Sequence, residues 1–522
     1  MVTLRSSTRQ RAQRSSNNIH SSTREITKHA SWDFLPQDIR RLILEIVSRQ
    51  EGWGSAASVC KEWQDFIATK NFGRLELNQS NVHGLSKIVR QRNLIRHIYL
   101  NVELPTYSCR SCDSSFIVKI AEAATVRTCS RKLFSILSTW GLDYRITLEL
   151  NVYSPSDQCH WFKNHLFGFD HEDEDDFTED LKLLHDPRHG WEHGKQVSAP
   201  HTAAIMHLFT PFTKDGLVSL NNFAEVPAIK KLIIRRQMRR RIPPDALQVL
   251  LERLPQLESI TYEPWYVLSN SERWSHEIGT RTIILQLPQS VRSITIFEDF
   301  NKHIMESVRY DSWGHIHTVY DDLDTRRVYS NLSCDLANEF VLRSLDLEHL
   351  SVSFMINSQH FFEACRAPST WPRLRSLILT TRIMTKGNHE EIMDEVAAAA
   401  IAAESMPQLE ALAIWYCSGK KACAAIFRRN QGPMARWSTL TWRGTEELEF
   451  SELAIEKWQN VVGDQTLLVK YEKVDGGDID SHGDAIHHLQ LPEGVIDPRS
   501  LAQIRKEGKL QKEAWAVLPV NS

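Results

Sequence analysis

A short apolar pattern recurs along the middle of the chain and restricts the folds that this chain can adopt. Each copy has an apolar residue, two further residues, a second apolar residue, any residue and a third apolar residue. The seven copies are Ile229/Leu232/Ile234, Leu257/Ile260/Tyr262, Val291/Ile294/Ile296, Leu347/Leu350/Val352, Leu374/Leu377/Leu379, Leu409/Leu412/Ile414 and Trp437/Leu440/Trp442. Their first residues are 28, 34, 56, 27, 35 and 28 residues apart, and 56 is twice 28. This period predicts a row of stacked units, since 522 residues exceed what one compact core usually holds.

Each unit is expected to pair a strand with a covering helix. Residues 245–254 and 392–406 have helical apolar spacing, and each segment stops before a proline, Pro255 or Pro407. Earlier strands are expected at Ile95/Ile98/Leu100 and Tyr144/Ile146/Leu148/Leu150. The fold class predicted for residues 73–460 is therefore α/β, an irregular leucine-rich-repeat-like solenoid with parallel strands on its concave face and helices on its convex face. The alternative is a set of unrelated strand-helix units in an ordinary α/β domain.

The middle position between the second and third apolar residues of each copy points away from the predicted core, because strand side chains alternate between faces. These positions are Ile233, Thr261, Thr295, Ser351, Ile378 and Ala413. The row carries no charge, which favours a protein or peptide partner over phosphate. We predict that it lines the concave face and binds the target.

An arginine-rich run directly follows the first copy of the pattern. Five cations lie within seven residues, and Arg235, Arg236, Arg239 and Arg240 are candidate target-binding residues. Such a run predicts a rim patch for an acidic partner or a phosphate backbone, with a solvated loop as the alternative.

A helical hairpin is predicted near the start of the chain. Leu35-Pro36 opens a helix, because proline is tolerated in the first helical turn. Its apolar stripe consists of Ile39, Leu42, Ile43, Ile46 and Val47. A second helix is expected over 56–67, with Val59, Cys60, Trp63 and Ile67 on one side. Two short helices cannot sustain a core alone, so another domain or another protein must cover them.

Residues 31–72 resemble an F-box, a small helical module. The resemblance rests on Leu35-Pro36, the apolar stripe and the segment from Ser58 to Trp63. It departs from the family pattern between Ser48 and Ser55, where Glu51-Gly52-Trp53-Gly54 replaces a polar and leucine-containing stretch. The resemblance implies docking on a Skp-family adaptor and, through it, on a cullin scaffold. The implied anchors are Leu35, Pro36, Ile39, Leu42, Ile43, Ile46, Val59, Cys60 and Trp63.

The combination resembles F-box proteins of fungi in which a degenerate repeat array is the substrate receptor. It predicts a non-catalytic substrate-recognition subunit of an SCF-type ubiquitin ligase, which brings an unknown protein target to the ligase. The alternative is a repeat-based protein-interaction scaffold without a link to ubiquitin, in which the hairpin only caps the solenoid.

Three further segments lie outside the repeat pattern. Residues 1–30 are rich in Ser and Arg and predict a disordered basic tail, with a transit peptide or nuclear-import segment as alternatives. Within the insertion 153–200, residues 170–176 hold six carboxylates and predict a solvated acidic loop. Residues 461–522 are expected to form a C-terminal cap and tail.

No enzyme motif was found, and no cofactor or metal is expected. Cys109 and Cys112 have the spacing of a zinc half-site that Cys129, Cys159 or His160 could complete, but a matching second half is missing, so a surface loop with two free thiols is predicted. The net charge of −3 favours neither a membrane nor nucleic acid as partner. The nine scattered cysteines and the lack of a long apolar run indicate a cytoplasmic or nuclear location.

Overall fold

The computed structural model describes most of the chain and divides it into two compact units, Met1–Ala68 and Thr69–Ser522. The described residues are 32–50, 52–112, 116–167, 184–212, 223–268, 270–301, 304–305, 323–365, 369–430 and 437–514. The predicted tail 1–30 and the acidic run 170–176 lie outside these residues. Each unit is described by itself.

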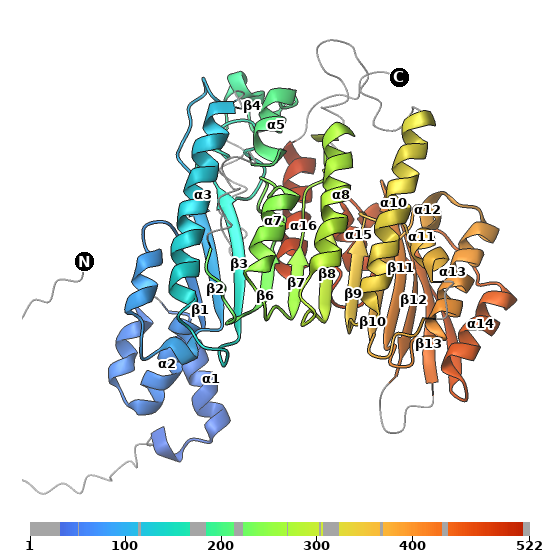
Figure 1. The fold of residues 1–522 in the computed structure, drawn as a ribbon, viewed down its shortest axis with the longest axis horizontal. Coiled ribbons are helices and arrows are strands. Elements are labelled where there is room, and N and C mark those ends of the chain that lie inside the picture. Colours follow the sequence, from blue (N-terminus) through green and yellow to red (C-terminus); the bar gives the residue numbers. More distant parts are fainter. Residues whose placement is uncertain are drawn as a thin grey trace, which may run out of the picture. The chain divides into compact units, whose positions relative to one another are not determined.

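The first unit is a small helical module (Figure 1). Its elements are the 3-10 turn η1 (Trp32–Phe34), α1 (Gln37–Val47), the 3-10 turn η2 (Trp53–Ser58) and α2 (Lys61–Gly73), within which the division between the units falls. Pro36 directly precedes α1, as predicted, because its fixed φ suits a helix start. Gly52 adopts a left-handed φ of 72° and opens η2. The second helix therefore begins at Lys61 and not at residue 56, since the preceding residues form the 3-10 turn.

The second unit is built on a twelve-stranded sheet whose strand order follows the chain. The strands are β1 (Arg74–Leu77), β2 (His97–Glu103), β3 (Ile146–Tyr153), β6 (Ile229–Ile234), β7 (Ser259–Tyr262), β8 (Ser293–Phe297), β9 (His349–Ser353), β10 (Ser376–Thr380), β11 (Ala411–Ser418), β12 (Lys421–Arg429), β13 (Trp437–Gly444) and β14 (Thr466–Lys473). From β1 to β11 all pairings are parallel, and β12 is antiparallel to both of its neighbours. A mostly parallel sheet is thus confirmed, including the two earlier strands expected from the sequence.

The register of the sheet explains the recurring apolar pattern. The second apolar residues of six successive copies are direct partners across the sheet: Leu232, Ile260, Ile294, Leu350, Leu377 and Leu412. The same row continues backward through Leu148, Ile98 and Leu75. One-residue slips would turn all of these side chains out of the core, so the pattern specifies the register.

The seventh copy departs from the regular arrangement. Between β11 and β13 the chain forms an antiparallel hairpin with β12 in place of a covering helix. Gly419 lies in the turn with a φ of 62°, a conformation that glycine adopts without strain. The interval of 28 residues between the last two copies therefore contains a strand.

Helices cover one face of the sheet in chain order (Figure 1). They are α3 (Phe116–Leu137), α7 (Pro244–Glu252), α8 (Asn270–Gln286), α10 (Leu323–Ser344), α11 (Ser358–Ala364), α13 (His389–Ala403) and α14 (Glu452–Val462). The helices α7 and α13 are the two that the sequence predicted. Their apolar side chains and those of the strands form the largest core of the protein.

The opposite face, which we call the second face, is covered by the C-terminal segment. The segment contains α15 (His482–Leu489) and α16 (Pro498–Ala514), drawn in red behind the sheet in Figure 1. A separate core joins strand residues such as Ile378 and Trp415 to Ile486, Leu489 and Ile504. Residues 461–522 were predicted as a cap and tail, whereas the described part of them supplies a strand and packs against the sheet.

The remaining elements are short. They are η3 (Val82–Lys87), η4 (Arg92–Leu94), η5 (Pro187–His189), β4 (Trp191–Glu192), β5 (Lys195–Gln196), α5 (Thr202–Phe209), α12 (Ile383–Lys386) and η7 (Gly476–Asp478). The strands β4 and β5 form a separate two-stranded sheet. Among the described residues, none of the helices has the length and apolar character needed to cross a bilayer.

Candidate functional site

The helix α1 leaves an apolar stripe exposed. Ile39, Leu42 and Ile46 are 43%, 54% and 59% exposed, and Val59 after η2 is 62% exposed. Leu44, which the sequence placed off the stripe, is instead the buried residue of α1, at 4% exposure. The helix therefore packs through Leu44 and presents the stripe outward, an arrangement that suits docking on another protein.

The module is held together by a shared carboxylate. Glu62 at the start of α2 accepts hydrogen bonds from the indole Nε1 of Trp32 and from a guanidinium nitrogen of Arg40, both at 2.8 Å. The rings of Trp32 and Trp63 lie 5.2 Å apart. These contacts fix α1 against η1 and α2. Sequence reasoning missed the role of Glu62, since nothing in its spacing links it to Arg40.

The residues implied as adaptor anchors differ in exposure. Pro36, Ile39, Leu42, Ile46, Val59 and Cys60 are exposed, while Leu35, Ile43 and Trp63 are half-buried. The exposed side chains are accessible to a partner, and the half-buried ones also contribute to packing within the chain.

The comparison with protein families bears on this module directly. Residues 32–75 match the F-box domain family. The chain therefore carries an F-box domain. An F-box supports an SCF-type adaptor role in general, through binding to Skp-family adaptors and thereby to cullin, and F-box proteins typically have no enzymatic activity.

The second unit is matched in part by a different family. Residues 286–497 match a family of unknown function, DUF6546. The matched range runs from the end of α8 to the loop before α16. None of the curated proteins matches the chain. The function of the second unit therefore has to be argued from its geometry.

The row predicted to bind the target is buried. Ile233, Thr261, Thr295, Ser351, Ile378 and Ala413 are all at most 7% exposed. They point to the second face, as strand alternation predicted, but the C-terminal segment covers that face. Thr295 donates its hydroxyl to the carbonyl oxygen of Gly494 at 3.2 Å. The prediction that this row binds a target is therefore wrong for the described structure.

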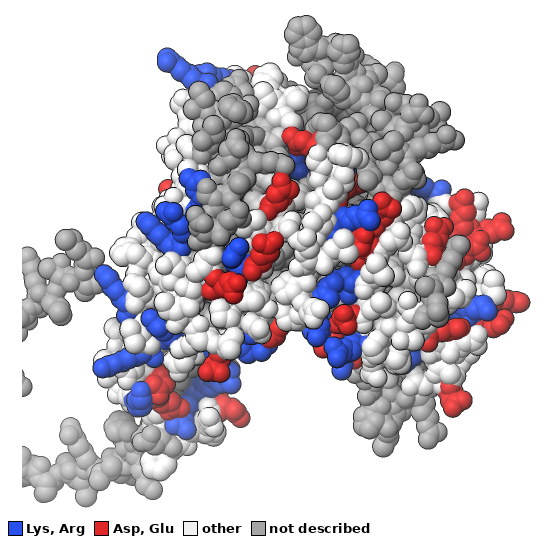
Figure 2. Space-filling model, viewed as in Figure 1, with Lys and Arg blue, Asp and Glu red and all other residues white. Residues whose placement is uncertain are grey.

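The arginine-rich run is buried as well, so neither a rim patch nor a solvated loop is correct. Arg235, Arg236, Arg239 and Arg240 are each at most 2% exposed. On the face drawn in Figure 2, blue and red side chains are interspersed, without a large basic field. The arginine-rich run follows the carboxyl end of β6, and its side chains point into the interior. There they pair with carboxylates from distant segments of the chain.

Each of these arginines has an acidic partner. Arg235 donates to Glu149 at 2.6 Å, and Arg240 donates to Asp157 at 2.7 Å. Arg236 lies between two carboxylates, since it pairs with Asp299 and donates to Glu507 of α16 at 2.9 Å. Arg239 also pairs with Glu507. We call these residues the arginine network: Glu149, Asp157, Arg235, Arg236, Arg239, Arg240, Asp299 and Glu507.

The arginine network shifts the pKa values of its acids. Burial raises the pKa of Glu149, but the hydrogen bond from His97 and the charges of Arg235 and Arg499 outweigh it and lower that pKa to about 2. The pKa of Glu507 is also lowered, because Arg236 and Arg239 outweigh its burial. Glu149 and Glu507 are therefore ionised at neutral pH, and Glu507 attaches α16 to the arginines that follow β6.

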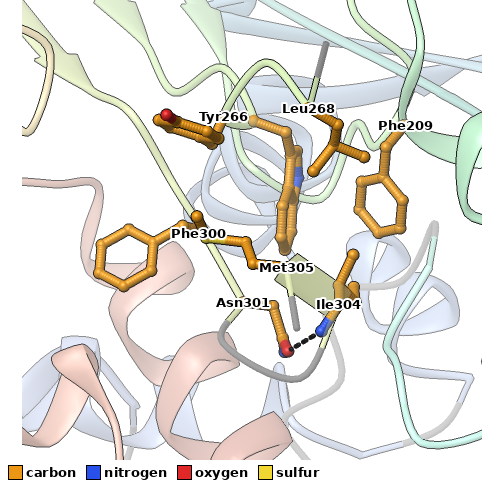
Figure 3. Close-up of a pocket in the computed structure, with 8 residues that line it drawn as sticks. Phe209, Tyr266, Leu268, Phe300, Asn301, Ile304 and Met305 are labelled. Carbon is orange, nitrogen blue, oxygen red and sulfur yellow. Dashed lines mark hydrogen bonds between the residues drawn. The ribbon is translucent and has the colours of Figure 1, made fainter. Parts of the chain in front are cut away.

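A small pocket lies beyond the carboxyl ends of β7 and β8 (Figure 3). It is lined by Phe209, Trp265, Tyr266, Leu268, Phe300, Asn301, Ile304 and Met305. Its single drawn hydrogen bond runs from the backbone N–H of Ile304 to Oδ1 of Asn301 at 3.2 Å. With a cavity volume of about 10 Å³, the pocket is far smaller than small-molecule sites. It gives no support to a substrate site.

In the structure, Cys109 and Cys112 each lie next to a histidine. Cys109 lies next to His160, one of the residues weighed as a partner, and Cys112 lies next to His189, which was not weighed. Cys129 instead belongs to the main core, and Cys159 is exposed. The sequence could not indicate His189, because it lies 77 residues beyond Cys112 and shares no ligand spacing with the pair.

Proposed function

We propose that this F-box protein is the substrate-recognition subunit of an SCF-type ubiquitin ligase. The F-box docks on a Skp-family adaptor through Leu35, Pro36, Ile39, Leu42, Ile43, Ile46, Val59, Cys60 and Trp63. The second unit holds a protein target, and the other subunits carry out the chemistry. The chain contributes proximity, because a target held on the same assembly reacts at a high effective concentration.

The observation that carries the proposal is the exposed stripe of α1. An apolar stripe that the rest of its own unit leaves uncovered is available to another protein. Here Ile39, Leu42 and Ile46 are exposed. Large apolar anchors of this kind dominate the energy of helical docking surfaces, which supports the adaptor over the scaffold alternative.

We further propose that the second unit is an irregular leucine-rich-repeat-like receptor. The chain-ordered strands, the aligned apolar row and the single layer of covering helices support this interpretation. Because the C-terminal segment covers the second face, we place the target contacts outside that face, on the covering helices or on the loops at the strand ends. We expect the complex to act in the cytoplasm, the nucleus or both.

Binding of purified full-length chain to a purified Skp-family adaptor tests the docking step. Leu42→Asp/Ile46→Asp places two charges on the exposed stripe, and we expect it to weaken binding at least about 100-fold, as loss of central anchors does. Leu453→Asp is the matched control, since Leu453 is a similarly exposed leucine, at 52%, on α14. It should bind like the wild type.

Equal binding by the wild type and the stripe variant would contradict the assignment of the docking surface. Absence of adaptor binding by the wild type would favour the scaffold without a ubiquitin link. Circular dichroism of the stripe variant separates loss of docking from loss of folding, because exposed positions contribute little to the core.

A further inference from the structure

Four potential metal ligands come together in the second unit, at the carboxyl ends of β2 and β3. Cys109 and Cys112 follow β2, His160 follows β3, and His189 ends the 3-10 turn η5. Sγ of Cys109 lies 3.6 Å from Nδ1 of His160, and Sγ of Cys112 lies 3.7 Å from Nε2 of His189. The ligand atoms of Cys109, His160 and His189 all lie within 4.8 Å of one another.

These distances fit the edges of a metal tetrahedron. Zinc ligands about 2.0–2.3 Å from a central ion stand roughly 3.3–3.8 Å apart when four of them are arranged tetrahedrally. Both sulfur–nitrogen separations fall in that interval. The ligand atoms of Cys109, His160 and His189 thus lie close enough together to share one ion, and Sγ of Cys112 reaches this group beside His189.

The outer ring nitrogens of both histidines are already fixed. Nδ1 of His189 lies 2.7 Å from a carboxylate oxygen of Asp186, and Nε2 of His160 lies 3.5 Å from the carbonyl oxygen of Tyr107. A carboxylate and a carbonyl only accept, so each of these nitrogens carries the proton. The lone pairs then lie on Nε2 of His189 and Nδ1 of His160, the atoms that face the thiols. This is the outer-shell arrangement that orients metal-binding histidines.

The surroundings of the cluster favour a closed structural site. Cys112, His160 and His189 are buried, and Cys109 is half-buried. Gly190 holds the turn after His189 with a φ of 71°, and a Cβ at that position would lie 2.6 Å from the carbonyl oxygen of Ser198. This turn therefore requires glycine, and its backbone conformation fixes the position of His189.

We propose that Cys109, Cys112, His160 and His189 bind one zinc ion with tetrahedral Cys2His2 coordination. Both thiols lose their protons to solvent on binding, and each sulfur and each imidazole lone pair forms one bond to the ion. Two thiolates neutralise its charge, so no net charge is buried. Sulfur and imidazole ligands in this geometry select zinc over the hard cations that prefer oxygen.

The site has a structural task in this chain. It connects the loop after β2, the turn after β3 and the segment around η5, which contain little regular secondary structure. The only strands of that segment in the described residues, β4 and β5, have two residues each. A metal that joins three such segments stabilises them by restricting the unfolded chain. This role is independent of the adaptor.

Metal analysis of the purified full-length chain tests the proposal. After dialysis against metal-free buffer, we expect about one zinc per chain, as for other closed four-ligand sites. Cys112→Ser and His189→Ala should lose most of it. Cys159→Ser is the matched control, because Cys159 is an exposed thiol from the same insertion, and it should retain the metal.

Cobalt substitution keeps the test valid if a variant fails to fold. Wild-type chain loaded with Co²⁺ should show the intense visible bands of a tetrahedral ion and a thiolate-to-cobalt charge-transfer band. His160→Cys, which adds a third thiolate, should strengthen that band. Substoichiometric zinc in the wild type, missing thiolate bands, or equal loss of zinc in Cys159→Ser would overturn the proposal. Removal of zinc should not change adaptor binding. The zinc proposal and the ligase proposal can therefore be refuted independently of each other.

Discussion

The carboxylate of Glu507 in α16 accepts a hydrogen bond from the guanidinium of Arg236 at 2.9 Å, across 271 residues of chain. Both side chains are buried. Glu507 also accepts from the backbone N–H of Leu166 at 2.8 Å and pairs with Arg239. The negative charge of Glu507 in the C-terminal helix therefore balances part of the positive charge of two buried arginines, Arg236 and Arg239. Such an arrangement couples the docking of α16 to the folding of the sheet.

Replacing Glu507 by glutamine should destabilise the second unit. The amide keeps the size of the side chain but removes the charge shared by Arg236 and Arg239, and breaking a buried pair in this way costs about 3–5 kcal/mol. Urea denaturation followed by tryptophan fluorescence measures the loss. Glu513→Gln is the control, because Glu513 is an exposed glutamate of the same helix, and it should change the free energy of unfolding by less than about 0.5 kcal/mol. Similar losses in both variants would show that the network contributes little.

The sequence predicted the sheet because its apolar residues alternate. Leu377 and Leu379 of β10 face the main core, and Ile378 between them faces the C-terminal segment. The spacing of the pattern accordingly gave the strands and their register. The exposed stripe of α1 was likewise readable from helical spacing, which does not depend on distant residues.

The burial of the second face was not readable in the same way. The helix α16 buries polar residues such as Gln503, Glu507 and Gln511 and carries exposed lysines, so its apolar periodicity is weak. Likewise, the sequence of the arginine-rich run is typical of a solvated loop, because the carboxylates that pair with it are distant in the sequence. Glu149 carries no clear signal either, because it alternates with Thr147 and Asn151 along β3 and so resembles the polar face of a half-exposed strand.

Acid should weaken the second unit through Glu149. Its pKa lies near 2 in the folded chain, against an ordinary value of 4.5, so between these values the unfolded state binds a proton that the folded state excludes. The stabilisation is present above about pH 4.5 and is lost as the pH falls toward 2. Urea denaturation at a series of pH values should show a falling free energy of unfolding in this window. Glu149→Gln should flatten the decline, and an unchanged slope in that variant would contradict the assignment.

Glu263 should act with the opposite sign. Burial raises its pKa to about 7, although the hydrogen bond from Ser500 opposes this shift. Between the ordinary value of 4.5 and about 7 the folded state holds a proton that the unfolded state releases, so stability falls as the pH rises through this window. Glu263→Gln should reduce this decline and leave the acid limb of Glu149 in place, while Glu395, whose pKa burial also raises to about 7, keeps the rest of it. The same denaturation series measures both effects, and a variant that keeps the wild-type profile up to pH 7 would contradict the prediction.

Gly483 sets how closely α15 and α16 approach each other. A Cβ at this position would lie 2.7 Å from Cγ2 of Ile504 and 3.0 Å from Cγ of Arg505. Gly483→Ala should therefore push α16 away and cost about 1–3 kcal/mol, although alanine favours helices. Thermal unfolding measures the effect. Gly141→Ala is the control, because a Cβ there meets nothing within 4 Å, and a comparable loss in both variants would contradict the close approach.

Leu42 and Leu44 lie two residues apart in α1, one exposed and the other buried. Alanine variants at these two positions should distinguish an effect on docking from an effect on folding. Leu44 is buried, so Leu44→Ala leaves a cavity and should cost about 2–5 kcal/mol of stability in the helical module. Leu42 is 54% exposed, so Leu42→Ala should leave the unfolding transition nearly unchanged while weakening adaptor binding at least about 10-fold. Calorimetry and binding titrations on the same preparations measure both quantities. If Leu42→Ala lowers stability as much as Leu44→Ala does, the stripe is part of the core of this chain, and its exposure can no longer support docking.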